Sequence, residues 1–164
     1  MTVRVRRARQ ADLPSLLALF EELDRLQRDW RLFTPRPGMA DEVTAKYGQG
    51  LTRRDVLVAV AEDDGEPVGM AFAEATTPSR FSDERTLELS GVIVREDRRR
   101  EGIGRLLVHE ALRYARERDL GWMTLQTFGP NRGAMEFWEA LGFTPRVVQL
   151  VAPLDDVARR LGDA

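Results

Sequence analysis

The feature that most constrains this chain is the segment from Val92 to Arg105, which has the sequence VIVREDRRREGIGR. An apolar run typical of a strand is followed by an arginine-rich polar turn, and Gly102 and Gly104 then open an amphipathic helical pattern. The start of a helix leaves several backbone N–H groups unpaired and carries positive partial charge, and glycines let an anion approach the backbone closely. The segment therefore predicts a strand–turn–helix unit that suits a pyrophosphate.

The elements around and after this unit alternate between strand and helix. Hydrophobic periodicity predicts strands over 87–95, 122–128 and 147–151, helices over 102–118 and 132–141 between them, and a last short helix over 154–161. Strands that are joined through helices lie parallel in one sheet. This alternation therefore indicates a βαβ unit.

The earlier part of the chain predicts a different arrangement. Alternating residues at 3–6 predict a strand, and apolar residues at helical spacing over 13–23 predict a helix, with a short second helix around 42–47. The runs 55–62 and 67–75 are joined by turn residues and predict an antiparallel hairpin. No repeat or linker divides the chain, so we expect one α/β domain over residues 1–164.

The composition excludes several kinds of site. The chain has no cysteine, which excludes disulfides, thiolate metal sites and cysteine nucleophiles, and His109 is its only histidine, so we expect no metal. The net charge is −2 with acids interspersed among the arginines, which disfavours nucleic-acid binding. No apolar stretch approaches the ~20 residues of a membrane span, and the N-terminus lacks a signal-peptide core. We expect a soluble cytoplasmic protein without membrane contact.

The two glycines of the turn have two explanations. They can serve backbone geometry alone, or they can admit a phosphate group. The dinucleotide pattern G-x-G-x-x-G fails because Leu107 occupies the third glycine position, and the chain has no G-x-x-x-x-G-K-[ST] segment. What remains is the pattern Arg-x-x-Gly-x-Gly, which is formed by Arg99, Gly102 and Gly104.

This pattern resembles the acyl-CoA signature of the GNAT superfamily of N-acetyltransferases, which follows the family's fourth strand. A second segment, from Asn131 to Phe143, is similar to the family's C-terminal pattern N-x-x-A-x-x-F-Y-x-x-x-G-F. The resemblance extends over nearly the whole chain. It implies a central mixed, mostly antiparallel sheet with a splayed parallel strand pair, flanked by helices. It also implies an enzyme that transfers an acetyl group from acetyl-CoA to a primary amine through a tetrahedral intermediate.

The resemblance further implies which residues bind acetyl-CoA. The backbone of Val92, Ile93 and Val94 would pair with the pantetheine arm like an added strand, with Asn131 and Phe137 beside that arm. The pyrophosphate would be held by the turn and the helix start, namely Arg99, Arg100, Glu101, Gly102, Ile103, Gly104 and Arg105. For Phe137 the alternative is a role in core packing alone.

Acetylation of an amine needs a neutral amine and a stabilised oxyanion. Glu88 is the candidate general base, because its distance from Arg99 matches that of a glutamate in several GNAT members. Four residues separate Glu88 from Val92, so their side chains are expected on one face of the sheet. Glu74 is the second candidate, and a solvated strand position is the alternative for Glu88. The oxyanion donor would be the backbone N–H of Val92, exposed by a strand bulge.

The chain departs from the family at Trp138, where many members have a tyrosine that protonates the leaving thiolate. An indole N–H is not a usable acid. Water or Tyr114 therefore supplies the proton, or none is needed, because a thiol pKa near ~8.5 makes the thiolate a tolerable leaving group. The departure keeps a second function open, a non-catalytic acyl-CoA-binding sensor or regulatory module, with Glu88 as the discriminating residue.

The acceptor is expected to be a small-molecule or peptide amine that the sequence does not identify. The segments 27–50 and 76–85 are expected to build its pocket, because acceptor pockets in the family come from variable segments. The resemblance also suggests a homodimer, and the apolar run at 147–152 supports it as an exposed strand edge that tends to be covered.

Overall fold

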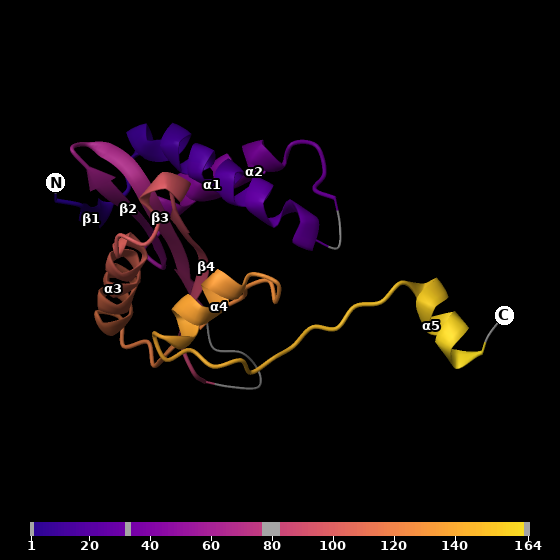
Figure 1. Cartoon of the computed structure of the whole chain (residues 1–164). Helices are drawn as coiled ribbons and strands as arrows, with labels where there is room; N and C mark the ends of the chain where they lie inside the picture. Colours follow the sequence, from indigo (N-terminus) through magenta and orange to yellow (C-terminus); the bar gives the residue numbers. More distant parts are fainter. Residues whose placement is uncertain (1, 32–33, 77–82, 163–164) are drawn as a thin grey trace. The chain divides into compact units, whose positions relative to one another are not determined.

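A computed structural model describes residues 2–31, 34–76 and 83–162 (Figure 1). The chain forms two compact units, Met1–Phe128 and Gly129–Ala164. The first unit holds the sheet and the three longest helices, and the second holds two short helices. Among the described residues, none of the helices has the length and apolar character needed to cross a membrane.

The first unit is built on a five-stranded sheet in the order β1-β2-β3-β4-β5. The strands are β1 (Arg4–Arg7), β2 (Val56–Asp63), β3 (Glu66–Ala75), β4 (Thr86–Val94) and β5 (Trp122–Leu125). The first three pairings are antiparallel, and β4 pairs with β5 in parallel. This confirms the expected mixed, mostly antiparallel sheet and the hairpin of β2 and β3.

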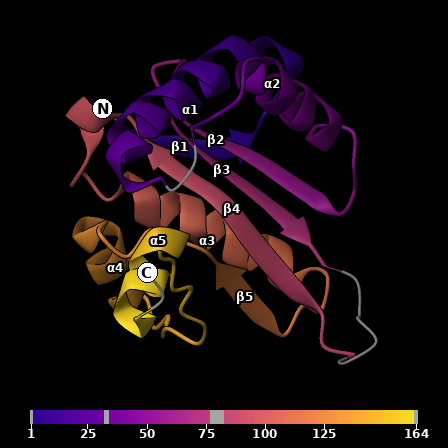
Figure 2. The same cartoon turned by 90° about the vertical axis from the view of Figure 1, so that its right-hand side faces the viewer.

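Helices cover both faces of this sheet (Figures 1 and 2). Helices α1 (Leu13–Gln27) and α2 (Met39–Gly50) lie on one face, and α3 (Ile103–Arg116) lies on the other. Side chains of α1 and α2 pack with inward residues of the strands in one apolar cluster, which includes Leu16, Tyr47, Val58, Phe72 and Ile93. The opposite layer is closed by buried residues of α3, namely Ile103, Leu107, Val108, Ala111, Tyr114 and Ala115. Burial on both faces explains why every residue of β2 is buried.

The second unit contains α4 (Arg132–Glu139) and α5 (Leu154–Leu161), both close to their expected bounds. The strand expected over 147–151 is wrong, because no regular secondary structure lies between residues 143 and 153. A strand needs a neighbour for its backbone N–H and C=O groups, and apolar residues alone do not supply one. Other bounds also differ: α2 is longer than the expected helix at 42–47, and β5 ends before 128.

Candidate active site

The site begins where β4 loses one of its two neighbours. β5 pairs only with the first part of β4, from Thr86 opposite Trp122 to Leu89 opposite Leu125 (Figure 2). Beyond Leu89, β4 continues to Val94 with β3 as its only paired neighbour among the described strands. The predicted pantetheine-binding residues, Val92, Ile93 and Val94, therefore lie on a strand edge whose backbone is open to an added strand.

A β-bulge at Ser90 separates these two parts of β4. In the pairing with β3, Gly91 lies opposite Phe72 and Leu89 lies opposite Ala73, so that Ser90 is an extra residue. The side chains of directly opposed residues point to the same face of a sheet. Glu88 is opposed to Glu74, on the Phe72 face under α1 and α2, whereas Val92 is opposed to Ala71 on the other face. The expectation that Glu88 and Val92 share a face is therefore wrong, because the extra residue inverts the alternation.

The turn after β4 presents a row of unpaired backbone donors. A short 3-10 helix (Glu96–Arg98) leads to Arg100 and Gly102, which have φ angles of 70° and 83°. No side chain caps the start of α3. In the described chain, no hydrogen-bond acceptor meets the backbone N–H groups of residues 100 to 104. Successive free N–H groups at a helix start can hold an anion, which suits a pyrophosphate, and the binding of a pyrophosphate here stays a prediction.

Gly102 is required at this turn for its conformation. A Cβ added there would have no heavy atom within 4 Å, so space is not the constraint. Its φ of 83° lies in the left-handed region, which side chains disfavour. Arg100 adopts the same region without being glycine, which is uncommon and marks a turn under local constraint.

Some arginines of the turn bind other protein groups, and others have no ion pair among the described residues. Arg99 donates from Nε to the carbonyl oxygen of Val94 at 3.1 Å and from Nη2 to Glu22 at 3.2 Å. Arg98 binds Glu101 and Asp63, and the Glu101 carboxylate chiefly raises the pKa of Arg98. Arg100 and Arg105 are exposed and have no ion pair within the described residues. These two are the side chains free to add charge-assisted hydrogen bonds to a phosphate.

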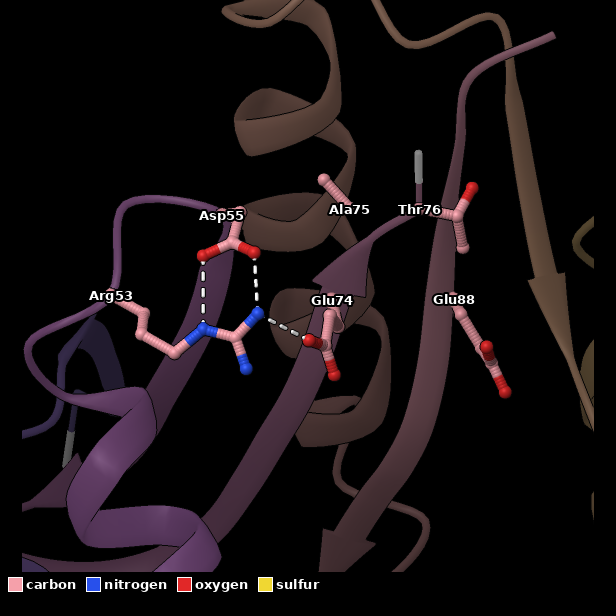
Figure 3. Close-up of a pocket in the computed structure, with 6 residues that line it drawn as sticks. All are labelled: Arg53, Asp55, Glu74, Ala75, Thr76 and Glu88. Atoms are coloured by element: carbon pink, nitrogen blue, oxygen red, sulfur yellow. Dashed lines mark hydrogen bonds and ion pairs between the residues drawn. The ribbon is translucent and has the colours of Figure 1, made fainter. Parts of the chain in front are cut away.

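A cavity of about 390 Å³ lies at the start of β4, on the face that carries Glu88 (Figure 3). It is lined by residues from three segments: Arg53 and Asp55 before β2, Glu74, Ala75 and Thr76 at the end of β3, and Glu88 on β4. Both candidate bases from the sequence thus line one cavity. Parts of the two segments expected to build the acceptor pocket, 32–33 and 77–82, lie outside the described residues.

Arg53 is held between two of these carboxylates. Its Nε lies 3.1 Å from Oδ1 of Asp55, and its Nη2 lies 2.5 Å from Oδ2 of Asp55 and 2.6 Å from Oε1 of Glu74. The hydrogen bond to Asp55, and then that to Glu74, raises the pKa of Arg53, and the guanidinium lowers the pKa of Asp55. Arg53 is therefore a fixed cation beside Glu74.

Glu88 has a different environment from Glu74. It is exposed, its carboxylate points away from Glu74, and within the described residues it makes no hydrogen bond or ion pair (Figure 3). Of the two candidate bases, Glu74 is committed to Arg53 and Glu88 is available to an incoming group. Glu88 can accept a proton, whereas the carboxylate of Glu74 is paired with Arg53.

The remaining predicted side chains have structural partners. The hydroxyl of Tyr114 donates to the carbonyl oxygen of Arg54 at 2.7 Å, burial raises its pKa, and Arg118 lies 3.6 Å over its ring. Tyr114 therefore has the partners of a packing residue, not those of a proton donor. In the second unit, Asn131 caps α4, since its Oδ1 accepts the N–H of Ala134 at 3.2 Å.

The aromatic residues of the second unit pack on one another. The rings of Phe137 and Trp138 lie edge to face with centroids 4.8 Å apart, and Trp138 packs in the same way on Phe143 at 5.2 Å. Trp138 thus fills the position of the family tyrosine as part of an aromatic cluster. The prediction that Asn131 and Phe137 lie beside the pantetheine arm stays a prediction.

Sequence reasoning missed Arg53 and Asp55. Their segment, Arg53-Arg54-Asp55, is one of many mixed-charge runs in the chain. The spacing of Arg53 and Asp55 permits a local ion pair. Nothing in the local sequence points to Glu74, because it lies 21 positions later and contacts Arg53 through the β2–β3 hairpin.

The chain is similar in sequence to known acetyltransferases. Residues 20–143 match the model of the Acetyltransferase (GNAT) family. An uncharacterised N-acetyltransferase of Methanocaldococcus jannaschii is 33% identical over 89 residues, which are 54% of this chain and 39% of that protein. The chain thus spans well under half of that relative's length. An uncharacterised N-acetyltransferase of Archaeoglobus fulgidus is 32% identical over 136 residues, 83% of this chain and 81% of that protein.

A solved structure shares the fold. The aminoglycoside N-acetyltransferase AAC(6')-Iy, crystallised with CoA, superposes with a TM-score of 0.73 over 92% of this chain and 95% of its own, at 21% sequence identity. At this identity the likeness concerns the fold.

Proposed function

Because the chain belongs to the acetyltransferase (GNAT) family, we propose that it transfers an acetyl group from acetyl-CoA to a primary amine of an acceptor. One observation carries the proposal: the open edge of β4 after the bulge leads directly into the row of free N–H groups before α3, and Glu88 stands unpaired on the other side of the bulge. An acyl carrier suits this order of groups, because its phosphate would meet the free N–H groups and its reactive carbonyl would lie toward Glu88. Both units are proposed to belong to one domain over residues 1–164.

Acetyl-CoA is proposed to bind along β4. Its pantetheine amides would hydrogen-bond to the open edge at Val92–Val94, as an added strand does. Its pyrophosphate would accept hydrogen bonds from the N–H groups of residues 100–104, supported by the side chains of Arg100 and Arg105. Arg99 would hold the turn against β4 and α1 through Val94 and Glu22. Asn131 and Phe137 are proposed beside the pantetheine arm.

The proposed reaction starts with removal of a proton from the acceptor ammonium by Glu88, directly or through one water. The neutral nitrogen attacks the thioester carbonyl carbon, and the N–H of Val92 donates to the oxyanion of the tetrahedral intermediate. The carbon–sulfur bond then breaks, and the nitrogen loses its second proton to water or to the departing sulfur. A thiol pKa of ~8.5 lets the thiolate leave without a dedicated acid, which agrees with the tryptophan at position 138.

The acceptor is proposed to be a small-molecule or peptide amine that is cationic around its reacting nitrogen. Among the described residues, the lining of the cavity carries the carboxylates of Asp55, Glu74 and Glu88 against the guanidinium of Arg53. Such a lining attracts an ammonium group and repels an acid. Nucleic acid and membrane surfaces are not proposed as partners.

A thiol-release assay with acetyl-CoA across a panel of amines tests this function. The panel should pair cationic amines with neutral and acidic analogues of equal size. We expect release of CoA with at least one cationic amine, and mass spectrometry should find the acetylated product. Calorimetric binding of acetyl-CoA without thiol release for any amine would instead identify a non-catalytic acyl-CoA sensor.

A cytoplasmic homodimer is the proposed working state. Its basis is the family and the apolar run at 147–152, which forms no strand within the chain. Light scattering over a wide concentration range should give twice the mass of the 18.6 kDa chain. A constant monomer mass would remove this proposal and leave the transfer reaction untouched.

A further inference from the structure

The cavity contains two glutamates at directly opposed positions of two neighbouring strands. Glu74 on β3 and Glu88 on β4 are opposed in the register. Directly opposed residues of an antiparallel pair have Cβ atoms about 5 Å apart, and like charges at such positions destabilise the sheet. Carboxylates that turned toward each other from such positions would repel. A cation bound to one of the two glutamates removes this repulsion.

Arg53 supplies this cation in a fixed position. Two of its nitrogens bind the two oxygens of Asp55, at 3.1 and 2.5 Å, and Nη2 also lies 2.6 Å from Oε1 of Glu74. The bidentate contact with Asp55 orients the planar guanidinium before it meets Glu74. Figure 3 shows the result: the carboxylate of Glu74 turns toward Arg53, and that of Glu88 points the other way.

We propose that Arg53 is a positioning residue that acts through Glu74. Its guanidinium binds Glu74 and turns that carboxylate from Glu88, which leaves Glu88 free to take the proton of the acceptor ammonium. Asp55 is the anchor of this arrangement and does not touch the acceptor nitrogen. The inference rests on the proposed function for the identity of the proton donor, but the arrangement of the carboxylates can be tested without it.

The helices on this face of the sheet carry charged groups that have partners of their own. From α2, the ammonium of Lys46 lies 4.9 Å over the ring of Phe72, on the same face of the sheet. From α1, Glu22 is bound to Arg99 and to the N–H of Glu96. On β5, the residue opposite Glu88 is Thr124, which has no charge. Among the described residues that line the cavity, Arg53 is the only cation.

The test measures the ionisation of both glutamates by carbon-13 NMR, which needs no catalytic activity. In Arg53→Gln, the titration of Glu88 should move to higher pH, because the charge of Glu74 is no longer paired with a cation. In the double variant Arg53→Gln with Glu74→Gln, it should return to its position in the native protein. Arg53→Lys keeps a charge without the bidentate contact and should fall between the two.

Kinetics gives a second readout in the same proteins. The acid limb of the kcat/KM profile for an accepted amine should move to higher pH in Arg53→Gln and return in the double variant, with acetyl-CoA affinity unchanged. Arg113→Gln is the matched control, because Arg113 also binds two carboxylates, those of Glu110 and Glu117, on the outer surface of α3. It should move neither the NMR titration nor the profile.

Two outcomes would overturn the inference. If Glu88 titrates alike in the native protein and in Arg53→Gln, Arg53 does not govern the ionisation of this pair. If Arg53→Gln raises KM for the acceptor and Glu74→Gln fails to restore it, Arg53 binds the acceptor directly. A native protein that releases no thiol with any amine would defeat the proposed function instead, and the NMR result would still decide the role of Arg53.

Discussion

The two halves of β4 differ in what lies beside them. Thr86–Leu89 is paired with β3 on one side and β5 on the other, whereas Gly91–Val94 is paired only with β3 in the described chain. In the first half, the backbone is paired on both sides, and this half carries Glu88. The second half offers backbone groups to a molecule from outside. One extra residue, Ser90, lies between the half that we propose for proton transfer and the half that we propose for binding acetyl-CoA.

This difference shows how a bulge can serve two tasks in one strand. Glu88 faces α1 and α2, and because the extra residue at Ser90 inverts the alternation, Val92 faces the α3 side of the sheet instead of the side of Glu88. The bulge also coincides with the end of pairing to β5. Substitutions in the two halves should therefore have separable effects, on the transfer step in one and on acyl-CoA binding in the other.

The largest effect is expected in the first half, from Glu88→Gln. The value of kcat/KM should fall by ~10²–10⁴ near neutral pH, because the acceptor stays an ammonium ion without a base. Part of the rate should return at alkaline pH, where more of the amine is neutral, while acetyl-CoA affinity stays close to that of the native protein. Pre-steady-state and steady-state rates over pH 6 to ~10 provide the measurement. An unaltered rate at every pH would show that the base lies elsewhere or that free amine is captured from solution.

The complementary change is Gly104→Asp, at the start of the helix that follows the second half. A carboxylate among the free N–H groups would meet the pyrophosphate at close range and repel it. We expect acetyl-CoA affinity to fall by more than ~10-fold, about 1.4 kcal/mol or more. Calorimetry provides the measurement, and Gly104→Ala separates the effect of the added Cβ from that of the charge, so that it should weaken binding by less. Equal affinities for the aspartate variant and the native protein would remove the binding site from this turn.

A smaller effect is expected from a change at Gly69 of β3, which packs closely against β4 and α3. A Cβ on Gly69 of β3 would lie 2.9 Å from the carbonyl oxygen of Ile93 and 3.3 Å from side-chain atoms of Ile103 and Leu107. The first contact is to backbone, so β4 or α3 must move. Gly69→Ala should lower the free energy of unfolding by about 1–3 kcal/mol and weaken acetyl-CoA binding.

Urea unfolding, followed by circular dichroism, measures this loss. Gly121→Ala is the control, because its Cβ would meet only Glu84 Oε2 at 3.6 Å, an ordinary contact. If both variants unfold at the same urea concentration, the close approach of β3 and β4 at Gly69 is not important to stability.

The smallest effect is expected from Trp138→Tyr, outside β4. The ring cluster with Phe137 and Phe143 should accept a tyrosine with little change in stability. The rate kcat should be unchanged or rise, the latter if protonation of the thiolate limits the native enzyme. Single-turnover rates with and without a viscogen separate this step from product release. A fall of kcat by ~10-fold or more would give the indole a role beyond packing.

Local sequence determined a large part of this protein. The strand, turn and helix around Gly102 and Gly104 came from contiguous residues, because glycine conformation, helix starts and apolar periodicity are short-range properties. The hairpin of β2 and β3, the long helices and the family were predicted for the same reason. Glu88 was singled out by its spacing to Arg99, and among the described residues of the cavity lining its carboxylate has no hydrogen-bond or ion-pair partner.

Tertiary structure decided what depends on partners distant in the chain. The face of Glu88 relative to Val92 was predicted wrongly, because a bulge is a property of two paired strands and one strand alone does not reveal it. The apolar run at 147–151 formed no strand, since a strand exists only with a neighbour for its backbone. Arg53 contacts Glu74 because the pairing of β2 with β3 places the two residues side by side. Periodicity sets what each segment can form, whereas register and pairing depend on energies shared between segments, and only the folded chain brings those segments into contact.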